Sequence, residues 1–231
     1  TSRMLPPLAA LINAAKVVGK DPADMKIVIS GAGAAGTAIA KRLRCIDQDP
    51  AVCTLVKEVS VCDRNGAIHR DIPNLSVEKR SLLQYSNKVN LSGSLKEMLV
   101  GVDVFVGVSS GGLLCADDIR TMADQPIVFP MANPTPEISP DGAFKGGAAV
   151  VGTGRSDYPN QINSVLAFPG IFRGALDVKA PRITAEMKIV AAHALAGSVA
   201  VPVGGRVLPS PLDRTVSPLI AKAVRRTVSE D

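Results

Sequence analysis

A short apolar run at residues 26–30 (KIVIS) leads directly into the glycine-spaced turn GAGAAG at residues 31–36. The run predicts a buried strand, and the residues after the turn predict a helix. Gly31 would permit the tight turn, Gly33 would let the backbone approach a diphosphate, and Gly36 would let the helix pack against the strand. The N–H groups at the start of such a helix face a bound phosphate. The pattern therefore predicts a dinucleotide-binding unit; the alternative is that the glycines only ease packing.

Further apolar runs alternate with helical patterns along the chain. Besides the first strand, strands are expected at 56–63, 102–109, 126–134 and 147–154. The first helix is expected from residue 7 to a stop at Gly19, and the second directly follows the glycine turn. A third should begin at a capping box of Ser94 and Glu97. Further helices are expected at 116–123, at 161–200 with breaks near Pro169–Gly170 and Pro181, and at 216–228. Strands that alternate with helices are joined by crossover helices and lie parallel. We therefore expect an α/β fold: a Rossmann-like, doubly wound, mainly parallel sheet with flanking helices and a C-terminal helical extension.

Composition limits the kinds of partner. The net charge of +5 is spread along the chain, and the only local basic cluster is KAVRR near the end, without the interleaved aromatic residues of a nucleic-acid surface. No apolar run reaches the roughly 18 residues of a membrane span. We therefore expect neither a nucleic-acid nor a membrane partner; a small polyanion fits the charge as well.

The cysteines and the first residues indicate the compartment. The four cysteines, Cys45, Cys53, Cys62 and Cys115, form no CxxC pair, which argues against a structural zinc site. We expect reduced, mostly buried thiols in a cytoplasmic protein. The first residues, TSRMLPP, do not resemble a secretory signal and lack an initiating Met, which predicts a processed or truncated chain.

An acidic residue at the end of the second strand is the next expected feature of a dinucleotide site. Asp63 sits 27 residues after Gly36, whereas the usual gap is about 20, so a longer loop around DQDPAVC would absorb the difference. Asp63 would bind the ribose hydroxyls of NAD, and Arg64 would instead pair with the 2′-phosphate of NADP. We favour NAD slightly. The alternative for Asp63 is a turn aspartate before Asn65-Gly66.

Polar loops follow the later strands, where ligands bind in sheets of this kind. These loops are GVSSGG with Ser109, MANPTPE with Asn133, and GTGRSDYPNQIN. Asn133 precedes a proline, which favours an extended backbone and directs its amide into the cleft. The alternative is a turn asparagine. The amides of Gln161 and Asn163 would meet a nicotinamide carboxamide or a substrate carboxylate.

The segments GAGAAGTAIAKRL, VCDRNGAI, ANPTPEISPD and above all GTGRSDYPNQINSVLAFPGIFRGALDV resemble the NAD(P)-binding, C-terminal domain of bacterial malic enzymes. RITAEMKIVAAHALA and LPSPLDRTVSPLIAKAV are similar to the family's C-terminal helices, so the resemblance covers roughly residues 8–228. It implies oxidative decarboxylation of (S)-malate to pyruvate and CO2 with NAD or NADP and with Mg2+ or Mn2+. Hydride would pass from C2 of malate to the nicotinamide, and the metal would then assist the loss of CO2 as a Lewis acid.

The resemblance also assigns residues. Ala32, Ala34 and Ala35 would line the pyrophosphate together with the glycines, and Asn133 would contact both the nicotinamide end and malate. Asn163 would contact the nicotinamide amide. The family has a second asparagine next, which contacts malate, whereas this chain has Ser164. Ser164 would therefore bind substrate differently; the alternative is a helix N-cap.

The family's catalytic tyrosine and lysine and its acidic metal ligands lie in an N-terminal domain ahead of this region. TSRMLPP does not match the ligand segment, and Tyr85 and Tyr158 lie inside the nucleotide-binding half. We therefore expect no catalytic residue and no metal ligand in this chain, which would bind NAD(P) without turnover. The implied organisation is an N-terminal helix at 1–24 leading from the missing domain, a Rossmann domain at 25–180, and helices at 181–231 that pack on it. The missing domain and further copies of the chain, in a homo-oligomer, are the implied partners.

Two other functions stay open. A different Rossmann-fold oxidoreductase, such as an amino-acid dehydrogenase, would need a catalytic residue in the cleft, and Asp157 and Lys145 are the local candidates. A non-catalytic nucleotide-binding module would need no such residue.

Overall fold

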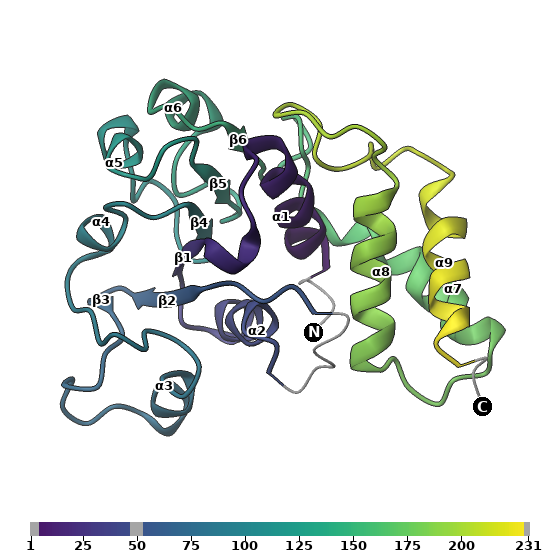
Figure 1. The fold of residues 1–231 in the computed structure, drawn as a ribbon, viewed down its shortest axis with the longest axis horizontal. Coiled ribbons are helices and arrows are strands. Elements are labelled where there is room, and N and C mark those ends of the chain that lie inside the picture. Colours follow the sequence, from purple (N-terminus) through teal and green to yellow (C-terminus); the bar gives the residue numbers. More distant parts are fainter. Residues whose placement is uncertain (1–4, 47–52, 229–231) are drawn as a thin grey trace.

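The computed structural model describes residues 5–46 and 53–228, and its centre is a six-stranded sheet with the order β3-β2-β1-β4-β5-β6 (Figure 1). The strands are β1 (Lys26–Ser30), β2 (Glu58–Asp63), β3 (Gly66–Ala67), β4 (Val104–Gly107), β5 (Ile127–Pro130) and β6 (Val150–Val151). Neighbouring strands are parallel except for β2 and β3, which are antiparallel. The expected doubly wound, mainly parallel sheet is confirmed.

Strand β1 lies at the point where the chain changes direction across the sheet. Ile27 is paired with Val59 of β2 on one side and with Val104 of β4 on the other. Loops that leave the carboxyl ends of two strands on either side of such a point diverge and leave a crevice between them. The crevice here opens beyond the carboxyl ends of β1 and β4.

Helices cover both faces of the sheet. They are α1 (Leu5–Val18), α2 (Ala34–Leu43), α3 (Val77–Leu82), α4 (Leu95–Met98), α5 (Ala116–Arg120), α6 (Pro140–Lys145), α7 (Phe168–Asp177), α8 (Ala185–Gly197) and α9 (Val216–Arg226), with short 3-10 turns η2 (Pro22–Asp24) and η3 (Ser164–Leu166). One hydrophobic core joins α1, α2, α7, α8 and α9 to the sheet, and a second joins α4, α5 and α6 to its other face (Figure 1).

The alternation of side chains along the strands explains the two cores. Ile27 and Ile29 of β1 belong to the core beneath α1 and α2, whereas Val28 between them belongs to the core beneath α5. Successive strand residues point to opposite faces, so a strand buried on both sides is apolar throughout. This is why the strands appear in the sequence as short continuous apolar runs.

The first and last helices share the larger core. Asn13 of α1 is fully buried and donates hydrogen bonds to the carbonyls of Ala196 (2.8 Å) and Val207 (3.0 Å). The contact ties α1 to the end of α8 and to the segment before α9, and Figure 1 shows α1 and α8 side by side. The division of the chain at residues 24 and 180 stays a prediction, because both flanking segments pack on the same core as the sheet.

Several local predictions are confirmed. Gly19 has φ +63 and follows the last residue of α1, as expected for a helix stop. Ser94 and Glu97 form the expected capping box at the start of α4.

Other predictions need correction. The expected helix from 161 is instead the short turn η3, and α7 begins only at Phe168. The proline and glycine at 169–170 lie in the first turn of α7, where proline lacks only a hydrogen bond that the turn cannot make. The expected break near Pro181 is confirmed, because α7 ends at Asp177 and α8 begins at Ala185. Strand β1 has the predicted bounds, but the other four predicted strands are shorter than their apolar runs; the run at 147–154, for example, contains only the two residues of β6. Of the remaining residues, Ser109, Asn133 and Gly154 line the cavities at the carboxyl edge of the sheet. The elements β3, α3 and α6 were not expected from the sequence.

The cysteine prediction is wrong for one pair. Cys45 and Cys53 form a disulfide, and their Cα atoms lie 5.8 Å apart, within the usual range for such a bond. Cys62 is buried in β2, as expected, whereas Cys115 is exposed. Burial, together with the charge of Asp63, raises the pKa of the Cys62 thiol to about 12.

Two expectations concern segments outside the described residues: the TSRM start of the chain, and most of the long loop between α2 and β2, at 47–52. Within the described ranges, none of the helices has both the length and the apolar character needed to cross a membrane.

Candidate functional site

The glycine turn has the geometry that its sequence predicts. Gly31 has φ +121, and a Cβ there would come within 2.8 Å of the Val108 carbonyl oxygen. A Cβ at Gly36 would come within 1.8 Å of the Gly31 carbonyl oxygen. Gly33 differs: it is the N-cap of α2, and a Cβ there would meet no atom within 4 Å. The chain therefore leaves open space at Gly33, at the start of α2, and the starts of helices are positions where proteins bind anions.

A cleft of about 640 Å³ lies in front of this turn, and we call it the turn cleft. Its lining residues come from the ends of β1, β2 and β4 and from α3 and α4: Ser30, Gly31, Ala32, Gly33, Asp63, Arg64, Asn65, Gly66, Lys79, Ser94, Leu95, Ser109, Ser110 and Leu113. Of the residues predicted to hold a dinucleotide, the diphosphate turn and the acidic residue of β2 are therefore brought together.

A second cavity, of about 360 Å³, lies beyond the ends of β4 and β5, and we call it the amide pocket. Its lining residues are Ala35, Ile39, Val108, Ser109, Met131, Ala132, Asn133, Gly154, Ile162, Asn163 and Ser164. Ser109 lines both cavities, so they meet at the end of β4. The predicted amides of two distant loops thus share one pocket with Ala35 of the glycine turn. Ala34 is not among the lining residues of either cavity and lies in the first turn of α2.

Asp63 has two partners within the turn cleft. One carboxylate oxygen accepts the backbone N–H of Asn65 at 2.7 Å, which is the turn role considered as its alternative. The other lies 2.5 Å from Nζ of Lys79 on α3. Burial favours the neutral acid, but the bonds from Lys79 and Asn65 outweigh it and hold the pKa of Asp63 below its usual value. The carboxylate is therefore ionised at neutral pH and still lines the cleft.

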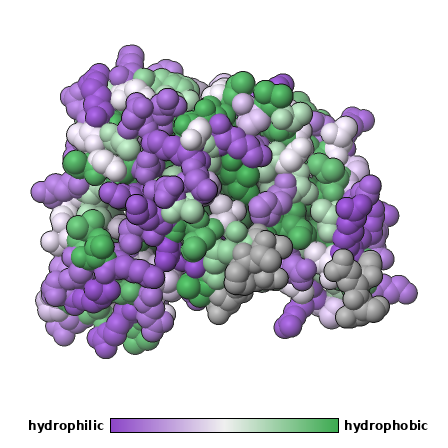
Figure 2. All heavy atoms as spheres, viewed as in Figure 1, coloured by the Kyte–Doolittle hydropathy of each residue, from purple (hydrophilic) through white to green (hydrophobic). Residues whose placement is uncertain are grey.

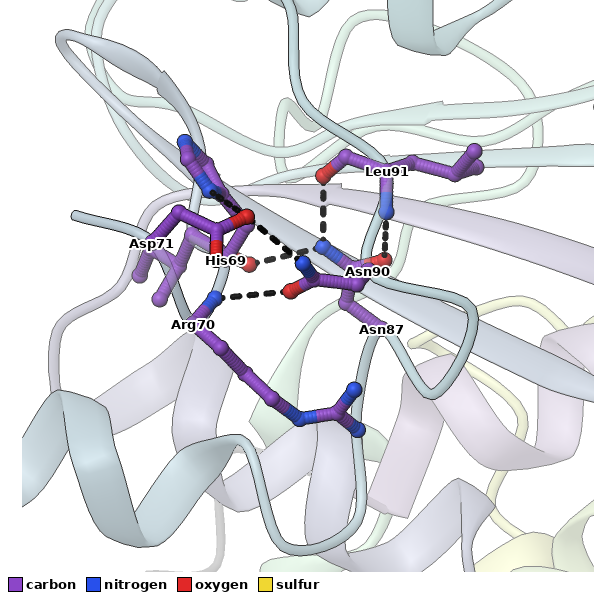
Figure 3. Close-up of polar contacts among 7 residues, drawn as sticks. His69, Arg70, Asp71, Asn87, Asn90 and Leu91 are labelled. Atoms are coloured by element: carbon purple, nitrogen blue, oxygen red, sulfur yellow. Dashed lines mark hydrogen bonds and ion pairs between the residues drawn. The ribbon is translucent and has the colours of Figure 1, made fainter.

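The segment after β3 is held by a network of asparagine contacts, shown in Figure 3. The fully buried Asn87 donates to the carbonyls of Ile68 and Leu91 and accepts the N–H of Leu91. Asn90 accepts the N–H of Arg70 at 2.8 Å and donates to Asp71 at 2.7 Å.

A neighbouring cavity of about 410 Å³ has Asp63, His69 and Lys79 among its lining residues. His69 Nδ1 lies 3.6 Å from the carboxylate of Asp71, which is too long for a hydrogen bond. Hydrophilic residues gather over α3 in Figure 2, and Glu78 and Arg80 of that helix are exposed. The turn cleft itself is lined by Asp63, Arg64 and Lys79, and it therefore carries charges of both signs.

The two asparagines of the amide pocket are placed differently. Asn133 is exposed at the end of β5, and its peptide bond to Pro134 is cis. Asn163 is the N-cap of η3, and its side-chain oxygen accepts the N–H of Val165 at 3.1 Å. The N-cap interpretation of Ser164 is therefore wrong, because Asn163 performs that role. Gln161 is not among the pocket's lining residues, and it forms a backbone bridge with Thr153 instead.

The sequence of residues 5–229 matches the family described as the NAD-binding domain of malic enzymes. This chain belongs to that family. It is 46% identical over 226 residues to the bifunctional malic/malolactic enzyme of Bacillus subtilis, covering 96% of this chain and 53% of that protein. It is 49% identical over 192 residues to the NAD-dependent malic enzyme of Geobacillus stearothermophilus, covering 83% of this chain and 38% of that protein.

Solved malic-enzyme structures agree with this assignment. The fold matches the NAD-dependent malic enzyme of Thermotoga maritima with a TM-score of 0.89 and 37% identity, over 97% of this chain and 57% of that one. The malic enzyme of Pyrococcus horikoshii matches with a TM-score of 0.86 and 40% identity, over 98% of this chain and 53% of that one. The chain thus spans about half the length, or less, of these malic enzymes.

Three residues of this malic-enzyme domain were missed by sequence reasoning. Lys79 was not predicted as a site residue because helix α3 was not expected, although Ser76, three residues earlier, is a helix N-cap signal. Glu137 was passed over as part of the loop MANPTPE. Asn160 has φ +55, and its side-chain amide donates hydrogen bonds to the carbonyls of Val151 and Gly204. Its side-chain oxygen accepts the N–H of Val207. These bonds hold the loop before Asn163 against the sheet.

The residues considered for an amino-acid dehydrogenase lie outside the pocket. Asp157 is exposed and paired with Arg155 at 2.6 Å. Lys145 is exposed at the last residue of α6. Neither residue lines the amide pocket.

Proposed function

We propose that this malic-enzyme domain binds NAD(P) for the oxidative decarboxylation of (S)-malate to pyruvate and CO2. The supporting observation is the shared lining of the amide pocket, where Ala35 of the glycine turn lies with Asn133 and Asn163. A dinucleotide with its diphosphate at the turn would extend its ribose toward Asp63 and its nicotinamide into this pocket. When bound, the dinucleotide would supply the acceptor for the hydride of malate.

The chain's own residues would bind and orient the reactants. The first N–H groups of α2 would hold the diphosphate, and the open space at Gly33 lets it approach. The amide of Asn163 would bind the nicotinamide carboxamide, and Asn133 would contact both ring and substrate. Ser164, at the rim of the same pocket, would contribute a shorter donor to malate than the family's asparagine.

The metal and the acid–base groups would come from outside this domain. Among the described residues, no group of three or more His, Cys, Asp or Glu side chains could hold a metal ion. The donors present do not fit Mg2+ or Mn2+, and we derive no step through the metal here. We propose that a catalytic tyrosine, a lysine and the metal ligands belong to the other half of a malic enzyme, which would complete the amide pocket. We also expect a homo-oligomer.

We propose NAD as the preferred dinucleotide. The ionised carboxylate of Asp63 accepts ribose hydroxyls and repels a 2′-phosphate. Lys79 offsets part of that repulsion through its 2.5 Å ion pair, and Arg64 lines the same cleft. NADP would therefore bind as well, but more weakly.

The experiment that tests this function compares two glycine variants by titration calorimetry with NAD. Gly33→Val adds a side chain to the open space in front of α2, so we expect the Kd for NAD to rise at least about a hundredfold while the fold is kept. Gly205→Val is the matched control, because a Cβ there also meets no atom within 4 Å. Equal NAD affinity in both variants would exclude the turn cleft as the diphosphate site. Failure of the unaltered chain to bind either dinucleotide would exclude every dinucleotide-dependent function.

A further inference from the structure

Glu137 is a buried carboxyl group that the proposed cofactor contacts leave unused. Its residue exposure is 0%, and it follows β5 in the loop that carries Asn133. One carboxylate oxygen accepts the backbone N–H of Ser109 at 2.9 Å, and the other accepts that of Ala132 at 3.1 Å. A carboxyl group is costly to bury, so its position calls for a physical reason.

The two amides that Glu137 binds belong to the wall of the amide pocket. Ser109 follows β4, Ala132 follows β5, and both line the pocket. The hydroxyl groups of Ser109 and Ser30 lie 2.8 Å apart, which extends the connection to the end of β1. The backbone of Glu137 also accepts the N–H of Leu114 at 3.0 Å. Glu137 therefore links the loops whose separation sets the width of the pocket.

The strand beside Glu137 leaves space for its carboxyl group. A Cβ added at Gly107, the last residue of β4, would come within 2.2 Å of the Glu137 Cδ atom. The other residues of β4 are valine and phenylalanine, so the strand is large and apolar except where the carboxyl group packs. Glycine at this position is thus explained by the buried carboxyl group.

The backbone partners of the carboxyl group favour its charged form. Both are N–H donors, and an ionised carboxylate presents acceptors alone. Burial raises the pKa of Glu137 above its ordinary value, although the hydrogen bonds from Ser109 and Ala132 act to lower it. The ionised group would place a negative charge directly behind the pocket wall.

We propose that Glu137 is a positioning residue that holds the β4 and β5 loops at the width of a nicotinamide ring and favours the oxidised cofactor over the reduced one. The nicotinamide ring of NAD carries a positive charge that the ring of NADH lacks. A buried carboxylate attracts that charge through a medium of low dielectric constant. The inference rests on the proposed function, because it requires the nicotinamide in the amide pocket.

Two variants separate the effect of Glu137 on the width of the pocket from the effect of its charge. The Kd values for NAD and NADH are measured by calorimetry or by NADH fluorescence. Glu137→Gln keeps the size but removes the charge, so the preference for NAD over NADH should fall by about threefold or more. Glu137→Asp keeps the charge but is one methylene too short to reach both amides. It should weaken both dinucleotides by similar factors and keep their ratio.

The control is Glu58→Gln, because Glu58 also accepts a backbone N–H, that of Lys88 at 3.1 Å, but at the amino end of β2. It should change neither Kd. Circular dichroism and thermal melting establish that each variant is folded, and Glu137→Asp alone still tests the positioning role if Glu137→Gln does not fold.

An unchanged ratio in folded Glu137→Gln, or unaltered affinities in Glu137→Asp, would overturn the inference while leaving the proposed function intact. If the unaltered chain binds neither NAD nor NADH, both the proposed function and this inference are overturned.

Discussion

Lys79 is a single side chain whose charge bears on the choice between NAD and NADP. It lies in α3, and its ammonium group reaches the carboxylate of Asp63 at the end of β2. The pair places a cation beside the position where a 2′-phosphate would lie. Charge-assisted hydrogen bonds to phosphate are stronger than neutral ones, so we expect the lysine to contribute more to the binding of NADP than to that of NAD.

We therefore expect Lys79→Ala to raise the Kd for NADP by about tenfold and to leave the Kd for NAD within about twofold. The substitution removes a phosphate partner and also leaves Asp63 free to repel the phosphate. Calorimetry with both dinucleotides measures the two constants. Lys88→Ala is the control, since Lys88 is exposed and lines neither cavity. A parallel change for both dinucleotides would show that Lys79 acts on the cleft in general.

The two free cysteines lie in different surroundings, which predicts different reactivities. The thiol of Cys62 is buried with a pKa raised to about 12, whereas Cys115 is exposed. At pH 8 we expect iodoacetamide to label Cys115 and to leave Cys62 unmodified in the folded protein. Mass spectrometry of peptides reads the labels. Labelling of Cys45 and Cys53 should require prior reduction, and their labelling without a reductant would contradict the disulfide.

At the scale of elements, glycine sets the distance between α7 and α9. A Cβ at Gly174 would come within 2.7 Å of both the Ala221 carbonyl oxygen and the Val224 Cβ atom. A Cβ at Gly170 would similarly meet Ile220 at 2.6 Å. The proline and glycine that suggested a helix break are thus part of a helix whose glycine face allows close packing.

Gly174→Val should force these helices apart and lower the free energy of unfolding by about 2 kcal/mol, which is typical of overpacking. The melting temperature, measured by circular dichroism, should fall by about 5 °C for a chain of this length. Gly197→Val is the control, because Gly197 lies in helix α8 and a Cβ added there would meet no atom within 4 Å. Equal melting temperatures for the two variants would contradict close packing as the reason for Gly174.

The whole molecule joins a nucleotide-binding sheet to helices from both ends of the sequence. The turn cleft and the amide pocket meet at Ser109, and the amide pocket stays open to solvent at Asn133. Tyr85 is buried in the larger core, and Tyr158 lies against Arg155, 5.8 Å from its guanidinium carbon. Neither tyrosine lines the amide pocket, where an acid–base group would have to act.

The chain by itself is therefore expected to bind NAD but not to oxidise malate. The absorbance of NADH at 340 nm, followed with malate and Mn2+ at saturating NAD, measures turnover. Calorimetry on the same sample establishes that the cofactor binds. Malate oxidation at the rate of an enzyme by this chain alone would falsify the assignment of the acid–base groups to another half.

Much of the fold could be predicted from the sequence because its signals are local. The apolar run at 26–30 and the glycines after it specify a strand, a turn and a helix within a few residues. The capping box at Ser94 and the stop at Gly19 depend on equally short spacings. The carboxyl-end rule then placed Asn133 and Asn163 near the turn, and both line the amide pocket.

The remaining features depend on contacts between residues far apart in the chain, and no local pattern encodes them. Lys79 is 16 residues from its partner Asp63 in the sequence, and Ser109, whose amide donates to Glu137, is 28 residues from it. Whether Pro169 and Gly170 end a helix or begin one depends on α9, which packs against that glycine. Burial and packing operate on positions in space, so only the folded chain decided which charges meet and which glycines leave room for a neighbour.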